Sequence, residues 1–338
     1  MDDGTKWWIE FVFIMVVLLI GLFGNIFVLI IVLEKETRKT INAIFVTSLA
    51  CADLVLLCLD SQFSFLRQFD VTVPCVFQAF TSTVVTTGYN AGLFTITSTA
   101  VHRCYLVTHP WRPKLKRRTV LMWVSLVWLV AFTFAMPLLF VIKPLRGPGL
   151  CDEVWPSLGM RRAYTAILTS VQFIMPLIVT ANCYFRTWLF LRRRPVVPRS
   201  RLKSESTTQE ETSRESSAIL KTVAVIVLLF LVLLLPTQVA WLLSDFKNVS
   251  YDELWTASDI LTRMHSCVNP LVYGIMNKRY RQSYFKFLLR IFGFCCHHSC
   301  YHSSSEPSTT QAPLENRMSD SVGPVVFKFN RNATDQSE

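Results

Sequence analysis

Charged side chains are scarce in this chain of 338 residues, since Asp, Glu, Lys and Arg together account for only 17% of it. A soluble globular domain usually carries about 25% charged residues. The scarcity is concentrated in long apolar blocks that short polar segments separate, and hydrophobic residues reach 51% of the chain. This pattern argues against a soluble domain and is typical of a membrane protein.

Alternating ten-residue strands, which would indicate a membrane β-barrel, are also lacking. A helix needs roughly 20 mostly apolar residues to cross the hydrocarbon, and its backbone groups must be satisfied within the segment. Seven blocks meet this requirement, at about residues 8–33, 40–65, 76–106, 119–141, 162–191, 217–243 and 255–276. We therefore predict an all-α membrane protein, a seven-transmembrane helix bundle.

Lys and Arg are unevenly distributed between the segments that join these blocks. If the N-terminus is outside, 21 of them lie on the inner side of the membrane and 8 on the outer side. Basic residues favour the cytoplasm, so we expect a plasma-membrane protein with its N-terminus extracellular and its C-terminus cytoplasmic. The net charge of +11 then reflects basic loops on anionic lipid rather than nucleic-acid binding.

The chain is predicted to divide into four parts. Residues 1–7 form a short extracellular N-terminus, and residues 8–276 form the transmembrane bundle. Residues 277–294 place basic and apolar side chains at helical spacing, which indicates a C-terminal amphipathic helix on the membrane surface. Residues 295–338 are rich in Ser, Thr and Pro and are predicted to be a disordered cytoplasmic tail.

Asn25, Asp53, Arg103 and Asn269 fall within or at the ends of predicted spans. Ionisable and amide groups are costly in the membrane, so each is a candidate functional residue. The alternative is that these groups pair with one another to hold helices together. The motifs around them favour the functional interpretation.

Six short motifs, in order along the spans, make residues 10–294 resemble rhodopsin-like (class A) G-protein-coupled receptors. They are Gly24-Asn25, LACADL at Leu49 to Leu54, Trp128 with Pro137, Pro176 with Tyr184, Phe230 with Pro236, and the NPxxY sequence Asn269-Pro270-Leu271-Val272-Tyr273. The resemblance implies a heterotrimeric G protein as partner, which Arg103 would contact while Tyr184 and Tyr273 move inward to support it. It also implies arrestin as a partner and a polar core at Asn25 and Asp53, with no cofactor.

Residues 258–273, SDILTRMHSCVNPLVY, further resemble the seventh span of CXC chemokine receptors and of their herpesvirus-encoded homologues. In that pattern Asp259 takes the place of an acidic residue that faces the ligand pocket. Asp60 lies in the second span, at a position where this sequence departs from the chemokine-receptor pattern. A basic CXC-type chemokine would complement these carboxylates. The short N-terminus, which contains no tyrosine, argues against chemokine docking.

The activation motifs depart from the family pattern. Asp-Arg-Tyr is replaced by His102-Arg103-Cys104, and the tryptophan before Pro236 is replaced by Leu234. His102 is neutral or weakly cationic near pH 7 and cannot supply a fixed negative charge to restrain Arg103. We therefore predict ligand-independent, constitutive signalling. A poorly coupled receptor or a ligand sink is the alternative.

The resemblance also implies a disulfide between Cys75 and Cys151, which the oxidising outer face permits. Beyond the amphipathic helix, Cys295 and Cys296 are predicted to be palmitoylated. A zinc site with the neighbouring histidines is less favoured, because its ligands are spaced too closely, and no metal site is predicted. Asn248-Val249-Ser250 is a glycosylation sequon in an outer loop.

Other functional classes lack their characteristic features. A transporter would show repeated halves or broken helices, and an intramembrane enzyme would need a catalytic pair on adjacent spans. The predicted function is a signalling receptor and not an enzyme. A non-signalling chemokine scavenger, or a partner subunit of another receptor, remains the alternative.

Overall fold

The computed structural model describes residues 3–33, 40–69, 71–113, 115–144, 151–193, 224–225, 227–229, 231–276, 281–285 and 289. The first four long helices are α1 (Asp3–Leu33), α3 (Ile41–Gln68), α4 (Cys75–Thr108) and α5 (Arg117–Ala135). A continuous fifth helix contains α7 (Leu158–Thr169), the π-helical turn η1 (Ser170–Ile174) and α8 (Met175–Arg193). The sixth span (Val227–Lys247) ends in the π-helical turn η3 (Leu243–Lys247), and α10 (Asp252–Met276) follows.

Five described segments are long and apolar enough to cross a membrane. They are Phe11–Leu33, Ile41–Gln62, Arg117–Val141, Leu158–Phe190 and Val227–Lys247. Helices α4 and α10 match the third and seventh predicted spans but are less apolar, and α10 carries Asp259, Arg263 and His265. Together these segments form the seven-transmembrane helix bundle that the sequence predicts.

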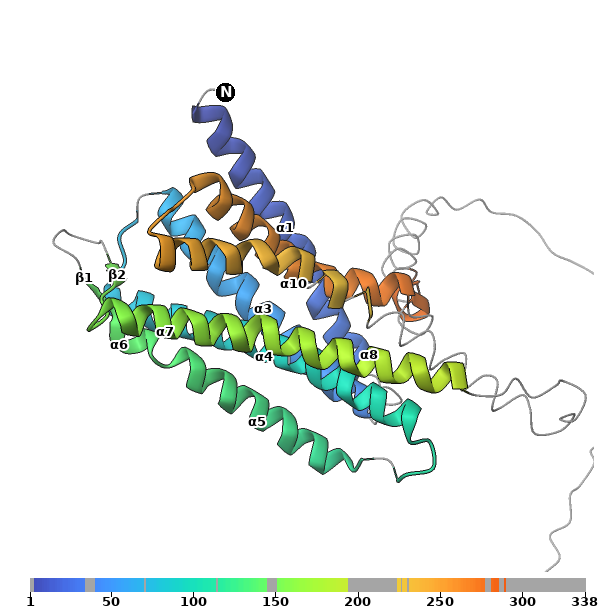
Figure 1. The fold of residues 1–338 in the computed structure, drawn as a ribbon. Helices are drawn as coiled ribbons and strands as arrows, with labels where there is room; N and C mark the ends of the chain where they lie inside the picture. Colours follow the sequence, from blue (N-terminus) through green and yellow to red (C-terminus); the bar gives the residue numbers. More distant parts are fainter. Residues whose placement is uncertain are drawn as a thin grey trace, which may run out of the picture. The chain divides into compact units, whose positions relative to one another are not determined.

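Helix α3 packs against both α1 and α4, and α4 also packs against α5 and α8. Figure 1 shows α5 beside α4, with the strands at one end of the bundle. The contact between α3 and α4 is close at Gly88, where an added Cβ atom would lie 2.9 Å from Val55 Cγ1 and 3.4 Å from the Ala52 carbonyl oxygen. A larger side chain at this position would push the two helices apart.

Two proline positions change the helices that the sequence predicts as continuous. The fourth predicted span, 119–141, is divided at Met136–Pro137 into α5 and the short helix α6 (Leu138–Val141). In the fifth, Pro176 lacks a backbone N–H, and the preceding Met175 N–H bonds to the Ser170 carbonyl across the π-helical turn. Such turns reorient the side chains that they carry.

The sixth span extends four residues beyond its predicted end at residue 243. The π-helical turn η3 continues to Lys247, and the helix then stops at Asn248, whose φ of 52° lies in the left-handed region. Asn tolerates this conformation better than most residues, which makes it a common helix-ending residue. The extension brings Asp245 into the bundle, where the structure buries it.

A disulfide closes the strand-bearing end of the bundle. Strands β1 (Ile142–Pro144) and β2 (Cys151–Glu153) pair antiparallel. Cys151 of β2 is bonded to Cys75 at the start of α4, with an S–S distance of 2.02 Å. The structure thus contains the bond that the family resemblance implies between these two cysteines.

Within the predicted amphipathic helix, residues 281–285 are helical. The Tyr284 hydroxyl donates to the Pro270 carbonyl at 3.1 Å, and the Tyr284 ring stacks on Phe27 with centroids 4.6 Å apart. Residues 277–280, 286–288 and 290–338 lie outside the described residues, and so do Cys295 and Cys296.

Candidate functional site

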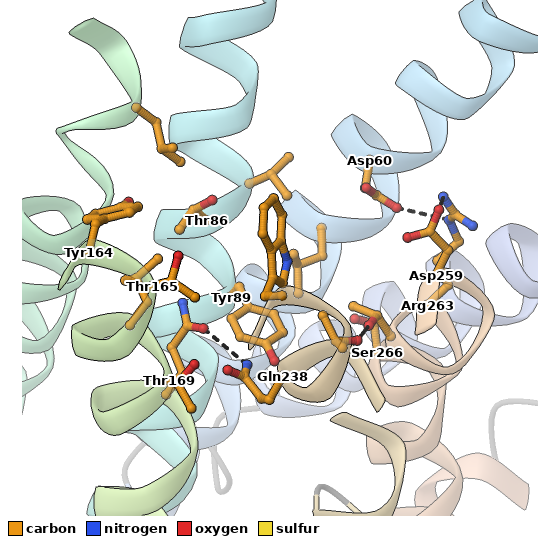
Figure 2. Close-up of a pocket in the computed structure, with 18 of the residues that line it drawn as sticks. Asp60, Thr86, Tyr89, Tyr164, Thr165, Thr169, Gln238, Asp259, Arg263 and Ser266 are labelled. Atoms are coloured by element: carbon orange, nitrogen blue, oxygen red, sulfur yellow. Dashed lines mark hydrogen bonds and ion pairs between the residues drawn. The ribbon is translucent and has the colours of Figure 1, made fainter. Parts of the chain in front are cut away.

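A cavity of about 270 Å³ lies at the end of the bundle that carries the disulfide. Its lining residues come from α3, α4, α6, α7, η1, the sixth span, α10 and β2 (Figure 2). Four of them carry formal charge, namely Asp60, Glu153, Asp259 and Arg263. Both of the acidic residues that the sequence placed in a ligand pocket, Asp60 and Asp259, line this cavity.

Arg263 neutralises part of that acidic wall, and this corrects the sequence interpretation. Its Nε atom lies 2.9 Å from Asp60 Oδ2, and its Nη2 atom lies 3.9 Å from Asp259 Oδ2. The sequence shows Arg263 as a basic residue in the seventh predicted span, and its pairing with Asp60 and Asp259 was not predicted. The i, i+4 spacing of Asp259 and Arg263 on one helix is the pattern that could have revealed the pair.

A second ion pair joins the fifth helix to the sixth near the same end. Arg161 Nε lies 2.8 Å from Asp245 Oδ1, and the Thr165 hydroxyl donates to the other carboxylate oxygen. Arg162 Nε donates to the Asp245 backbone carbonyl at 2.9 Å. Asp245 is only 2% exposed, so its charge depends on these donors. Sequence reasoning missed this role because the partners are about 80 residues apart.

Glu153 brings strand β2 into the cavity wall. Its Oε2 atom accepts a hydrogen bond from Trp155 Nε1 at 2.8 Å. Burial raises the pKa of the Glu153 carboxyl, and the nearby Asp245 and Asp152 act in the same direction, whereas the Trp155 hydrogen bond and Arg161 oppose the rise. The carboxyl group thus lies in a poorly solvated part of the wall.

Buried amide side chains connect three helices beside the cavity. Gln172 Nε2 donates to Asn90 Oδ1 at 2.7 Å, and Gln238 Nε2 donates to Gln172 Oε1 at 3.2 Å. Gln172 belongs to the π-helical turn η1, and Gln172 and Gln238 both line the cavity. These hydrogen bonds link α4, η1 and the sixth span, and they give the buried amide groups partners inside the protein.

The predicted polar core is present and joins three helices. Asn269 Nδ2 donates to Asp53 Oδ2 at 2.8 Å, which links α10 to α3. Asn25 Nδ2 donates to the carbonyls of Gly21 at 3.0 Å and Ser266 at 2.9 Å. For these three residues the structure shows the helix-joining role that the sequence analysis gave as the alternative. Among the described residues, no group of three or more His, Cys, Asp or Glu could hold a metal ion.

At the opposite end of the bundle, Arg103 bonds to an amide side chain. Its Nη2 atom donates to Asn42 Oδ1 of α3. His102 packs against Phe45 with ring centroids 5.5 Å apart, and neither imidazole nitrogen has a hydrogen-bond partner among the described residues. Asn42 as the partner of Arg103 was not predicted, because no sequence motif marks it.

Three further predicted activation residues, Tyr184, Tyr273 and Leu234, lie in or beside apolar clusters. Tyr184 and Tyr273 pack against a cluster of Leu49, Ile96, Ala100, Val227 and Val272. Leu234 is fully buried in a second cluster with Leu93, Phe94 and Ala131, and Cys104 is also buried. Pro236 lies in the sixth span and Pro270 within α10, whereas Phe230 lies outside the described residues.

Asn248, the asparagine of the glycosylation sequon, is exposed just after η3.

Comparison with known proteins agrees with this arrangement of helices and motifs. Residues 24–273 match the seven-transmembrane receptor (rhodopsin family). The chain belongs to this family of multi-pass membrane receptors, whose members are G-protein-coupled receptors and not enzymes.

Three relatives show the range of similarity. Neuropeptide FF receptor 1 of Rattus norvegicus is 26% identical over 79% of this chain and 67% of its own length. The RYamide receptor of Drosophila melanogaster is 26% identical over 94% of this chain and 72% of its own length. The QRFP-like peptide receptor of Branchiostoma floridae is 25% identical over 93% and 85%. None of these three is named as a chemokine receptor, so they do not support the predicted kinship with chemokine receptors or their viral homologues.

Proposed function

We propose that this protein is a polypeptide-activated G-protein-coupled receptor of the plasma membrane, with the 270 Å³ cavity as its ligand site. The supporting observation is the charge of the cavity wall, where Asp60, Glu153 and Asp259 outnumber Arg263. A cationic ligand is complementary to such a wall, and this complementarity favours its encounter with the site. The names of the relatives, which include receptors for neuropeptides, agree with a peptide ligand.

The sequence also predicts a narrower class of ligand, the CXC-type chemokines. The support for it is the resemblance of residues 258–273 to chemokine receptors, together with the position of Asp259 in the cavity wall. Short cationic peptides and chemokines share the property that the wall selects, which is positive charge. A panel containing both therefore tests the general proposal and distinguishes the two ligand types.

The proposed orientation places the disulfide and the cavity outside the cell and Arg103 inside. The distribution of Lys and Arg supports it. An epitope tag at the N-terminus should be accessible to antibody on intact cells, and a tag at the C-terminus should require permeabilised cells. The reverse pattern would refute this orientation.

We also propose that basal signalling is high. The support is local, since Arg103 bonds to the neutral Asn42 and the preceding residue is His102 instead of an acid. Residue 102 therefore supplies no fixed negative charge beside Arg103, where the family pattern has an acid. Arrestin binding, palmitoylation of Cys295 and Cys296, and glycosylation of Asn248 stay predictions.

The decisive experiment measures second-messenger output in cells that express the full chain, with and without the ligand panel. We expect Arg103→Ala to abolish output at equal surface expression. Asp259→Asn should raise the half-maximal concentration of an active ligand about tenfold, equivalent to about 1.4 kcal/mol. The matched control is Asp252→Asn, an exposed change in the first turn of the same helix. No output under any condition would favour a scavenger or partner subunit.

A further inference from the structure

Arg263 is unusual among the residues that line the cavity. It supplies the one positive charge in that lining, among the residues that the structure describes, and it lies in a transmembrane helix. Its side chain is only 8% exposed, while the side chains of Asp60 and Asp259 are 38% and 60% exposed. A buried guanidinium in a span is costly unless it is paired, so its placement calls for a specific reason.

The geometry joins one guanidinium to two carboxylates. The short contact, 2.9 Å, reaches from α10 to Asp60 on α3, and the longer contact, 3.9 Å, stays within α10 at Asp259. Figure 2 shows the three side chains together on one side of the cavity. Arg263 can therefore lose the contact with Asp60 and still keep a carboxylate one helical turn away.

A cation that enters the cavity comes close to the carboxylates of Asp60 and Asp259, which already pair with Arg263. When a ligand cation replaces Arg263 on Asp60, Asp60 and Arg263 both keep a charged partner, which avoids the penalty of a buried, unpaired charge. A ligand without a cationic group cannot make this exchange. The wall therefore selects the ligand by its positive charge.

We propose that Arg263 occupies, in the receptor without ligand, the position that the cationic group of the ligand takes on binding. It occupies the cation subsite between Asp60 and Asp259, and a guanidinium or ammonium group of the ligand displaces it from Asp60. The inference rests on the proposed function for its ligand, since a cationic polypeptide must enter this cavity. The inference identifies Arg263 as a residue that determines ligand specificity, and it identifies the group selected as a guanidinium or ammonium group.

The exchange would also act on the bundle. The Asp60–Arg263 pair joins α3 to α10, and the Asp53–Asn269 hydrogen bond joins the same two helices deeper in the bundle. A ligand cation on Asp60 breaks the Asp60–Arg263 pair and leaves the Asp53–Asn269 hydrogen bond in place. Ligand binding thereby loosens α10 at its cavity end, and α10 carries the NPxxY sequence.

The test uses purified full-length receptor in lipid nanodiscs and needs no peptide ligand and no G protein. Propylguanidinium at about 10 mM is the probe, and propylurea, which has a similar shape and no charge, is its control. We expect the probe to raise the unfolding temperature of Arg263→Ala by about 3 °C, as a ligand that binds only the folded state does. Wild-type receptor, whose subsite is filled, should shift by less than about 1 °C under the same linkage.

Two further variants identify the subsite. The double variant Asp60→Asn/Arg263→Ala should lose the response to propylguanidinium. Arg161→Ala removes the arginine of the other inter-helix pair, which does not line the cavity. Its unfolding temperature should respond to propylguanidinium no more than that of wild type. If Arg263→Ala or Arg263→Gln does not accumulate in folded form, propylguanidinium added during expression should restore the yield.

An Arg263→Ala receptor that responds neither in unfolding temperature nor in yield would overturn the inference. So would an equal response to propylurea, or a response that survives Asp60→Asn. These results leave the proposed function intact, because they concern a small probe. A receptor that responds to the probe but to no cationic polypeptide would instead refute the proposed function.

Discussion

At the end of the bundle that carries the disulfide, ion pairs join neighbouring helices, whereas at the end that carries Arg103 the described contacts are mainly apolar and include the Arg103–Asn42 hydrogen bond. The first end has the Cys75–Cys151 disulfide and the Arg161–Asp245 and Arg263–Asp60 pairs. At the second end, neither His102 nor the Tyr184 hydroxyl has a hydrogen-bond partner among the described residues.

The difference corresponds to the two tasks of a receptor. Disulfides and short ion pairs are directional and fix the positions of the groups that they join, which suits a site that must recognise a ligand. Apolar packing between helices in a membrane is less directional and can be exchanged for other packing at small cost. We therefore expect helix movements to be larger at the Arg103 end than at the cavity end.

Breaking the covalent link should have the largest effect. Cys75→Ser opens a loop of 76 residues, and the chain-entropy estimate for such a loop is about 4 kcal/mol of stability. We expect a large fall in the unfolding temperature and in surface expression. Cys58→Ser, a change at an exposed free cysteine, is the control. Equal behaviour of the two variants would show that the disulfide does not stabilise this end.

Removing the buried carboxylate of the second ion pair should have the next largest effect. Asp245→Ala leaves the Arg161 guanidinium and the Thr165 hydroxyl without the carboxylate that accepts from them, and loss of one partner of a buried pair costs roughly 3 kcal/mol. Thermal unfolding of the purified receptor measures it, with the exposed change Asp252→Asn as control. A change below about 0.5 kcal/mol would mean that solvent compensates for the carboxylate, as at surface pairs.

An acid placed at the Arg103 end should make that end resemble the other. His102→Asp supplies a charge beside Arg103, and we expect basal second-messenger output to fall roughly fivefold, or about 1 kcal/mol. His102→Asn, which removes the imidazole and adds no charge, should leave the output near the wild-type level. Unchanged output in His102→Asp at equal surface expression would refute the acid-loss explanation of basal activity.

The smallest effect concerns the pH dependence of the cavity end. Because burial raises the pKa of Glu153, the folded state binds that proton more tightly than the unfolded state. Glu153 therefore contributes stability at low pH that is lost as pH rises from about 4.5, its ordinary pKa, through its raised value. The unfolding temperature of Glu153→Gln relative to wild type should rise across that interval. A constant difference would show that the carboxyl group is well solvated.

Local patterns predicted the helices and the motifs well, because both depend on residues close together in the chain. Apolar length predicted the spans, and the disulfide followed from the family resemblance. The prolines were not interpreted fully. Pro137 ends α5 and Pro176 is preceded by a π-helical turn, and neither outcome is specified by the presence of a proline alone.

The partners of the charged residues were the part that sequence did not predict. Arg263 and Asp60 are 203 residues apart, Arg161 and Asp245 are 84 apart, and Arg103 and Asn42 are 61 apart. Each side chain was visible in the sequence as a charge in or near a span. Which group neutralises it depends on how the helices face each other, and that arrangement changed an acidic pocket into a partly neutralised one.

The sequence by itself determined that this chain is a membrane-spanning receptor, because apolar length and motif order are properties of the chain that lipid selects directly. The tertiary structure alone decided which polar groups meet. In a low-dielectric interior each buried charge must find a partner, and the partner available is set by helix packing across distant parts of the chain. Arg263 shows the distinction, since its sequence position predicts a charge in a span and only the fold makes it the occupant of a cation site.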